Sequence, residues 1–147
     1  MRIADLLRRK GSMVATVTPR TRVSELLARL AEHNVGALVV VDGAGAVAGI
    51  VSERDVVRRL HQHGPDLLSR EVGDIMTTVV ATCGPQDSVD ELSALMTQRR
   101  IRHVPVLVDG TLAGIVSIGD VVKSRMDELE QNQEQLEAYI AGGRFHT

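Results

Sequence analysis

The residues best suited to do chemistry in this chain are a serine and an aspartate at a fixed spacing, which occur twice. Ser52 and Asp55 close the phrase Gly-Ile-Val-Ser-Glu-Arg-Asp, and Ser117 and Asp120 close Gly-Ile-Val-Ser-Ile-Gly-Asp. Each phrase is expected to begin a helix, whose free N–H groups and positive dipole attract a phosphate. An ionised aspartate in the first turn is an acceptor that can hold both hydroxyls of a ribose. The two phrases therefore have the chemistry of a nucleotide site.

The same spacing also has a purely structural explanation. A serine followed three residues later by an acid resembles a capping box, in which both side chains satisfy backbone N–H groups at a helix start. The repetition favours binding, because two units related by a pseudo-twofold axis would bring both helix starts to one cleft. Capping without binding stays open as the alternative.

The cations that a nucleotide's phosphate needs are unequally shared between the two copies. Arg54 has Gly119 as its counterpart, while Arg102 and His103 replace two small residues of the first copy. The sequence therefore predicts two unequal clefts, with solvent-facing charges as the alternative. The remaining basic clusters are assigned to solvated helix faces: residues 8–10, 58–59 and 99–100.

These residues are positioned by two copies of one α/β unit. Residues 14–57 recur in type and order as residues 80–122, with a slip of a single residue in a turn, which marks a duplication. Helical periodicity begins at Val23 and at Val89, with Thr21 and Asp87 or Ser88 as caps. Short β-branched runs separated by turns predict two hairpins, with strands over residues 37–41, 47–51, 104–108 and 112–116. A second helix begins at Ser52 or Ser117 of each copy.

A short lead-in strand is expected before each unit, at residues 3–7 and 72–76. The expected organisation is a first repeat over residues 1–60, a linker over 61–71, a second repeat over 72–125, and a C-terminal helix and tail over 126–147. In the terminal helix, apolar residues fit a and d positions of a short heptad pattern with Gln133 at the remaining core position. They are Met126, Leu129, Leu136 and Ile140. This helix either lies on its own domain or pairs with another chain.

Composition excludes several classes of function. The 147 residues carry a net charge of −2, and only Tyr139 and Phe145 are aromatic, so a nucleic-acid surface lacks both the positive field and the stacking platforms it needs. The single cysteine, Cys83, allows no internal disulfide and suits a reducing compartment. His61 and His63 lack a third ligand nearby, so no metal site is expected. The absence of a signal-like start or membrane-length apolar run indicates a cytoplasmic protein.

With its doubled Gly-Ile-Val-Ser-x-x-Asp phrase, the chain resembles a tandem pair of CBS domains, the Bateman module, from residue 3 to about residue 125. The resemblance implies an α/β fold of two pseudo-twofold-related CBS repeats, each β-α-β-β-α, followed here by the C-terminal helix. It also implies an adenosyl ligand in the cleft between the repeats and a homodimer shaped as a flat disk. Regulation, and not catalysis, is the implied activity.

The resemblance also implies roles for individual residues. Asp55 and Asp120 would hold ribose, and Ser52 and Ser117 the phosphate end. Arg54, Arg102 and His103 would supply the charges for the phosphate, and Thr16, Thr78 and Val80 would line the adenine.

The expected function is a regulatory sensor of AMP, with ADP, ATP, NAD and S-adenosylmethionine as the other candidate ligands. A ligand-dependent change in the homodimer would act on a regulated protein that the sequence does not disclose. No catalytic residue and no catalytic cofactor are expected. The alternative is a structural or assembly module whose clefts are empty, in which the two Ser-x-x-Asp phrases serve only as caps.

Overall fold

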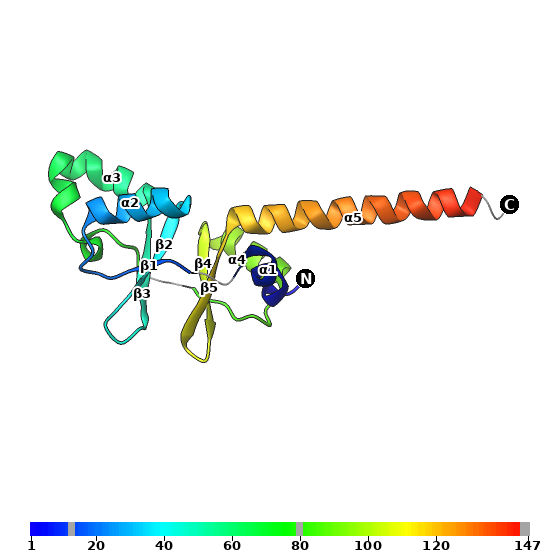
Figure 1. The fold of residues 1–147 in the computed structure, drawn as a ribbon, viewed down its shortest axis with the longest axis horizontal. Coiled ribbons are helices and arrows are strands. Elements are labelled where there is room, and N and C mark those ends of the chain that lie inside the picture. The colour runs from blue at the N-terminus through cyan, green and yellow to red at the C-terminus, as the bar shows by residue number, and fades with distance from the viewer. Residues whose placement is uncertain (12–13, 79–80, 145–147) are drawn as a thin grey trace.

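The computed structural model describes residues 1–11, 14–78 and 81–144. Two small sheets lie side by side in the middle of the molecule, each covered by helices on its outer side (Figure 1). Buried aliphatic side chains form two separate cores, one for each sheet. This is the mixed α/β architecture of two related halves that the repeat predicts.

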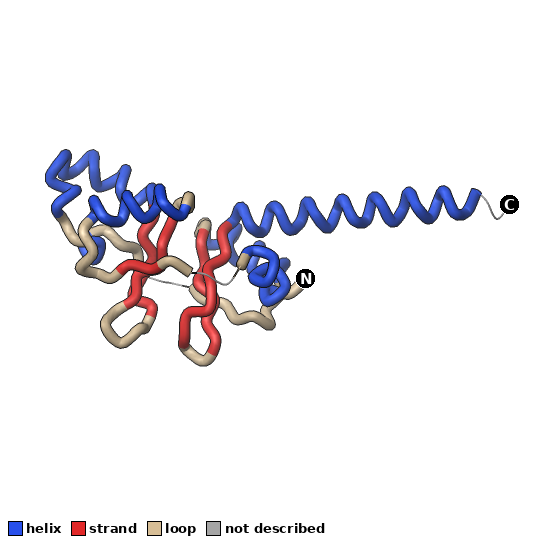
Figure 2. Tube along the Cα trace, viewed as in Figure 1, coloured by secondary structure: helices blue, strands red, loops and turns tan. Residues whose placement is uncertain are grey.

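The first half contains the three-stranded sheet. Strand β1 (Thr16–Val17) pairs in parallel with β2 (Ala37–Val41), which pairs antiparallel with β3 (Val47–Ser52). Helices α2 (Val23–His33) and α3 (Glu53–His63) pack on it, followed by the 3₁₀ helices η1 (Gly64–Ser69) and η2 (Val72–Asp74). Figure 2 shows these helices grouped at one end of the molecule.

The second half repeats this arrangement. Strands β4 (His103–Val108) and β5 (Thr111–Ser117) form an antiparallel hairpin, and α4 (Val89–Arg99) packs beside it. A parallel bridge from Cys83 to Val106 corresponds to the pairing of β1 with β2. The prediction of four hairpin strands is confirmed to within one residue at each end.

Each hairpin turn has the conformation that its residues favour. Asp42 in the longer first loop accepts hydrogen bonds from the backbone N–H groups of Ala44 and Ala46 through its Oδ1 atom. The second loop is the two-residue turn Asp109-Gly110, with φ of 51° and 79°. Positive φ at both residues is typical of a type I′ turn, which matches the twist of the two strands. The one-residue slip between the repeats therefore lies in these turns.

The N-terminal segment packs against the second half of the chain. Helix α1 (Ile3–Lys10) buries Ile3 and Leu6 in the core that contains Val104. Backbone hydrogen bonds of 2.9 and 2.8 Å join Ile3 N to Asp87 O and Ala4 N to Pro85 O. In Figure 1, α1 accordingly lies beside α4, far from the strands that follow it in sequence.

The segment between the repeats makes the reciprocal exchange. Val72 and Ile75 are buried in the core of the first half. Gly73 N donates to Pro19 O over 2.8 Å, and a Cβ at Gly73 would lie 3.1 Å from that oxygen. The two halves are thus linked by exchanged segments: residues before the first half pack in the second core, and residues before the second half pack in the first core.

The predicted lead-in strands at residues 3–7 and 72–76 are wrong, because residues 3–7 lie in α1 and residues 72–74 form η2. In α1 the acid Asp5 lies in the first turn and three basic residues lie in the last, the order that a helix dipole favours. Ile3 and Leu6 share one helix face, a spacing that strand alternation does not explain. The cap predicted at Thr21 is also wrong, since Thr21 Oγ1 accepts from Thr18 N, whereas Ser88 caps α4 as predicted.

Helix α5 (Ile118–Arg144) joins two predicted helices into one continuous element. Its first turns pack on the second half, and the remainder projects away from the body (Figure 1). The projecting part exposes Met126, Leu129, Leu136 and Ile140, the residues of the predicted heptad. Nothing in the described part of this chain covers that apolar stripe.

Candidate functional site

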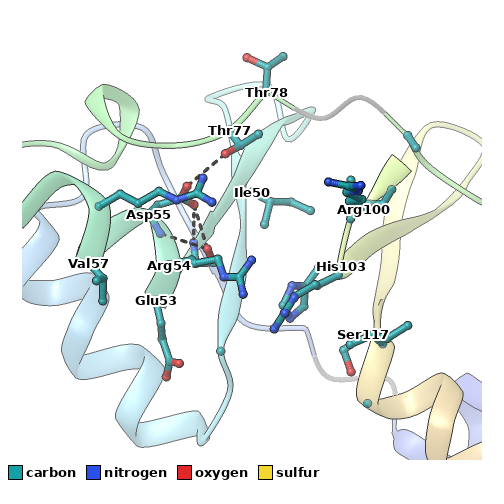
Figure 3. A pocket seen from close by; sticks show the side chains of 18 residues that line it. Ile50, Glu53, Arg54, Asp55, Val57, Thr77, Thr78, Arg100, His103 and Ser117 are labelled. Carbon is teal, nitrogen blue, oxygen red and sulfur yellow. Dashed lines mark hydrogen bonds between the residues drawn. The ribbon is translucent and has the colours of Figure 1, made fainter. Parts of the chain in front are cut away.

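A cavity of about 700 Å³ lies between the two halves and is lined by both. From the first half come the end of β3, the start of α3 and residues 77–78; from the second come the end of α4, the start of β4 and the junction of β5 with α5. Figure 3 shows these side chains on the two walls of the cavity. A volume in this range accommodates a small organic ligand.

Asp55 forms the predicted capping box and still has acceptor capacity on the cavity. Its Oδ2 atom accepts from Ser52 N over 2.9 Å and from Ser52 Oγ over 3.1 Å. Its Oδ1 atom accepts from Thr77 Oγ1 over 3.3 Å, the contact drawn in Figure 3. Within the described residues no cation pairs with Asp55. Capping and ligand binding are therefore compatible here, because they use different oxygens.

The backbone N–H groups at the two helix starts are largely taken by the chain itself. Glu53 N donates to Gly36 O over 3.0 Å, and Ile118 N donates to Arg102 O over 2.8 Å. Asp55 N and Asp120 N donate to the serine Oγ atoms of their own capping boxes. These four N–H groups are therefore engaged within the chain, and side chains are the main source of positive charge at the cavity.

Those side chains make the cavity electropositive. Four arginines line it against two carboxylates, since Arg54, Arg58, Arg100 and Arg102 face Glu53 and Asp55. Figure 3 shows Arg54 and His103 pointing towards one another from opposite halves. Such a focused positive field suits an anionic ligand.

Two of these arginines were missed by the sequence analysis, which placed residues 58–59 and 99–100 on solvated helix faces. Arg58 reaches the cavity because it lies one turn after Arg54 on α3. Arg100 reaches it because the chain turns back after α4 with Arg100 in the left-handed conformation, at φ 54°. The position of Arg100, just after a predicted helix and just before the strand that begins at His103, could have indicated that it lies at the cavity. Thr77 and Ile50 are further lining residues that the motif did not indicate.

The surroundings of His103, at the start of β4, disfavour its charged form. Burial lowers its pKa below the ordinary 6.5, and the charges of Lys10 and Arg102 lower it as well, whereas Asp120 and Glu53 raise it. An anion beside the ring would oppose these effects, because a nearby negative charge raises the pKa of an imidazole.

The structure brings together most, but not all, of the predicted site residues. Those that line the cavity are Ser52, Arg54, Asp55, Thr78, Arg102, His103 and Ser117. Thr16, in β1, is not among the described residues that line it, because β1 pairs on the far side of β2 from β3. Thr78 follows the bridge residue Thr77 and is not in a strand. Val80 lies outside the described residues.

Asp120 is placed differently from its counterpart. It lines a second, smaller cavity of about 340 Å³ together with Lys10. Lys10 Nζ donates to Asp120 Oδ2 over 2.6 Å. Partial burial raises the pKa of Asp120, but hydrogen bonds from Lys10 and Ser117 and the charge of Lys10 outweigh it, so the net pKa lies below 3.8. The two acids of the repeated motif therefore have different surroundings, a difference that the motif did not show.

The described residues contain no cluster of three or more His, Cys, Asp or Glu side chains that could hold a metal ion. Across the same residues, no helix combines the length and apolar character that crossing a membrane requires.

Comparison with known proteins identifies the family. A family model described as the CBS domain matches residues 3–62 and again residues 72–127. The chain is 40% identical to the CBS domain-containing protein CBSX3, mitochondrial, of Arabidopsis thaliana, over 96% of this chain and 72% of the plant protein. A crystal structure of a CBS-domain containing protein from Agrobacterium tumefaciens is 45% identical with a TM-score of 0.80, over 84% of this chain and 92% of that one.

A third similar structure, CBSX2 in complex with AMP, is 26% identical with a TM-score of 0.69, over 86% of this chain and 96% of that one. Relatives of this chain are thus CBS-domain proteins, and one of them binds an adenine nucleotide. The two matched segments correspond to the two halves of the structure, apart from their exchanged first elements. The chain therefore belongs to the CBS domain family, with two CBS domains in tandem.

Proposed function

We propose that this protein is a regulatory sensor that binds AMP, or a related adenine nucleotide, in the cavity between its two halves. The observation that carries the proposal is the position of Asp55, a carboxylate that lies in an arginine-rich cavity and forms no ion pair within the described residues. A ribose needs an acceptor and a phosphate needs cations, and this cavity offers both. AMP binding by the similar protein CBSX2 supports the same ligand class.

The lining residues suggest an orientation for the nucleotide. With its ribose on Asp55, the base lies beside Thr77 and Thr78, and the phosphate crosses to the wall that holds Arg102 and His103. Arg54 reaches the same space from the first half. The ligand would then touch both halves at once.

A ligand that contacts both halves is suited to regulation. It favours whichever arrangement of the halves closes on it, and it shifts their equilibrium only by its difference in affinity between the two arrangements. The proposed activity is therefore control of a partner protein. The cytoplasmic location and the absence of nucleic-acid binding remain predictions.

The second candidate function is a structural or assembly module. One observation favours it: both capping boxes are complete without any ligand. In that case the two acids serve the fold alone, and no nucleotide should bind.

Thermal unfolding with and without AMP separates the two candidates. A ligand that binds only the folded state stabilises it by about 1.4 kcal/mol at ten times its Kd. We expect AMP to raise the melting temperature, with uridine monophosphate as a control that offers the same ribose and phosphate on another base. Absence of a shift with every adenine nucleotide at millimolar concentration would leave the structural role.

AMP binding should be accompanied by proton uptake at His103. A phosphate beside the imidazole favours the imidazolium, so the pKa of His103 rises on binding from its lowered value. Affinity should therefore increase as the pH falls through the window between the bound pKa and the lower free pKa. Calorimetry at pH 7 in two buffers of different ionisation enthalpy measures the uptake. His103→Gln should lose this proton uptake, and equal uptake in both proteins would place His103 away from the phosphate.

We also propose a homodimer. Helices α3 and α5 expose Leu60 and Val122, at 47% and 51%, while Val56 and Val121 are buried in their own halves. Light scattering should give a dimer at micromolar concentration, and Leu60→Asp with Val122→Asp should shift it to a monomer. Val108→Asp, at the exposed tip of the second hairpin, is the matched control and should stay dimeric. A wild-type monomer would contradict the proposal.

A further inference from the structure

The two halves place the same pair of acceptors at the edge of each hairpin. In the first half these are Ile50 O and the carboxylate of Asp55. Thr77 serves both, because its N–H donates to Ile50 O over 2.8 Å and its hydroxyl donates to Asp55 over 3.3 Å. Figure 3 shows this threonine over the carboxylate.

In the second half the equivalent acceptors are Ile115 O and the carboxylate of Asp120. Here a single ammonium group serves both, since Lys10 Nζ donates to Ile115 O over 2.8 Å and to Asp120 Oδ2 over 2.6 Å. The pseudo-twofold repeat therefore puts a cation where the first half has an amide and a hydroxyl. Lys10 reaches this position because α1 packs in the second core and ends there.

This exchange changes the charge of the site. Thr77 is neutral, so Asp55 keeps its full negative charge for a ligand. Lys10 neutralises Asp120 in a pair whose side chains are only 33% and 25% exposed, compared with 59% and 71% in the surface pair of Arg125 with Asp90. Water and salt screen the less exposed pair more weakly.

The exchange also makes Asp120 a weaker acceptor for a ligand. Lys10 holds the carboxylate through a charge-assisted bond to Oδ2, and a ribose hydroxyl, which is a neutral donor, gains less at this neutralised acid than at Asp55. The lysine stem and Leu6 also line the smaller cavity, which has about 340 Å³ against about 700 Å³ for the first. Its volume is near the lower end for ligand sites.

We propose that Lys10 closes the second nucleotide site, built around Asp120, so that each chain binds one adenine nucleotide and not two. This inference rests on the proposed function of the first cavity. Lys10 is a residue that determines stoichiometry, and its displacement would open a second site for the same class of ligand.

Calorimetric titration of the full chain with AMP tests the proposal. The wild type should bind one AMP per chain. Asp55→Asn weakens the first site, and adding Lys10→Met, which keeps most of the lysine stem without its charge, should restore tight binding of one AMP per chain. We expect the double variant to bind at least about tenfold more tightly than Asp55→Asn alone. Adding Asp120→Asn should abolish this recovered binding.

Arg9→Met is the matched control. Arg9 is the neighbour of Lys10 and lines the same smaller cavity, but in the described part of the chain it makes no hydrogen bond to Asp120. In the Asp55→Asn background it should recover no binding, although it removes the same charge from the same cavity. Circular dichroism checks that each variant folds, and Lys10→Gln replaces Lys10→Met if the latter does not.

The outcomes separate this inference from the proposed function. Two AMP molecules per wild-type chain would overturn the role of Lys10 and leave the sensor intact. One AMP in the wild type with no recovery in the double variant would do the same. Recovery by Arg9→Met would show a general charge effect and would also overturn it. If neither the wild type nor the Lys10→Met variant binds AMP, the proposed function fails and this inference fails with it.

Discussion

Gly49→Ala is expected to lower the free energy of unfolding by about 3 kcal/mol, the upper end of the usual cost of overpacking. A Cβ at Gly49 would lie 2.6 Å from Thr77 O and 3.1 Å from Met76 Sδ. Thr77 O is the acceptor of Ile50 N in the bridge that joins residue 77 to β3. Because that neighbour is backbone, it cannot turn aside, and the whole segment beside Asp55 must move.

Urea denaturation measures this effect, and two other glycines provide controls. Gly43→Ala, in the first hairpin loop, meets no atom within 4 Å and should cost little. Gly114→Ala places its Cβ 2.8 Å from Leu7 Cδ2, the end of a flexible side chain, and should cost less than Gly49→Ala. Equal stability of all three variants would show that the Thr77 bridge does not restrain this part of the fold. The Gly49 variant should also lose AMP binding, since Thr77 and Asp55 line the cavity together.

Asp55→Asn is expected to weaken AMP binding by about 10- to 100-fold, because hydrogen bonds to a charged group are worth about 1.5 to 3 kcal/mol. The fold should persist, since asparagine retains an acceptor for Ser52 N and is itself a good residue near helix starts. Calorimetry of the folded variant gives the change in Kd directly.

Asp120→Asn is the matched change in the other repeat. Because Asp120 is held by Lys10 and lines the smaller cavity, its substitution should leave the affinity of the first cavity nearly unchanged. Equal weakening by both substitutions would mean that the two acids serve one ligand. An unchanged affinity for AMP in the Asp55→Asn variant would show that Asp55 serves only as a helix cap.

The repeat, the hairpins and the helix starts were predictable because each depends on neighbours in sequence. A short run of β-branched residues predicts strands such as β2, and the Ser-x-x-Asp spacing predicts a capping box that both halves form. The resemblance to CBS domains followed from the same local phrases. Many of the groups that line the first cavity were therefore predictable from the sequence, among them Asp55, Arg54, Arg102 and His103.

Only the tertiary structure decided which segments meet. Residues 3–7 match residues 72–76 in sequence, yet one segment forms an α-helix and the other a 3₁₀ helix, and each packs in the core of the opposite half. That exchange carries Lys10 to Asp120 and Thr77 to Asp55, across 110 and 22 residues of chain. Sequence periodicity reports which face of an element is buried, but not which core buries it. These long-range contacts leave Asp55 beside a neutral threonine and pair Asp120 with a lysine. Two nearly identical motifs therefore differ in charge.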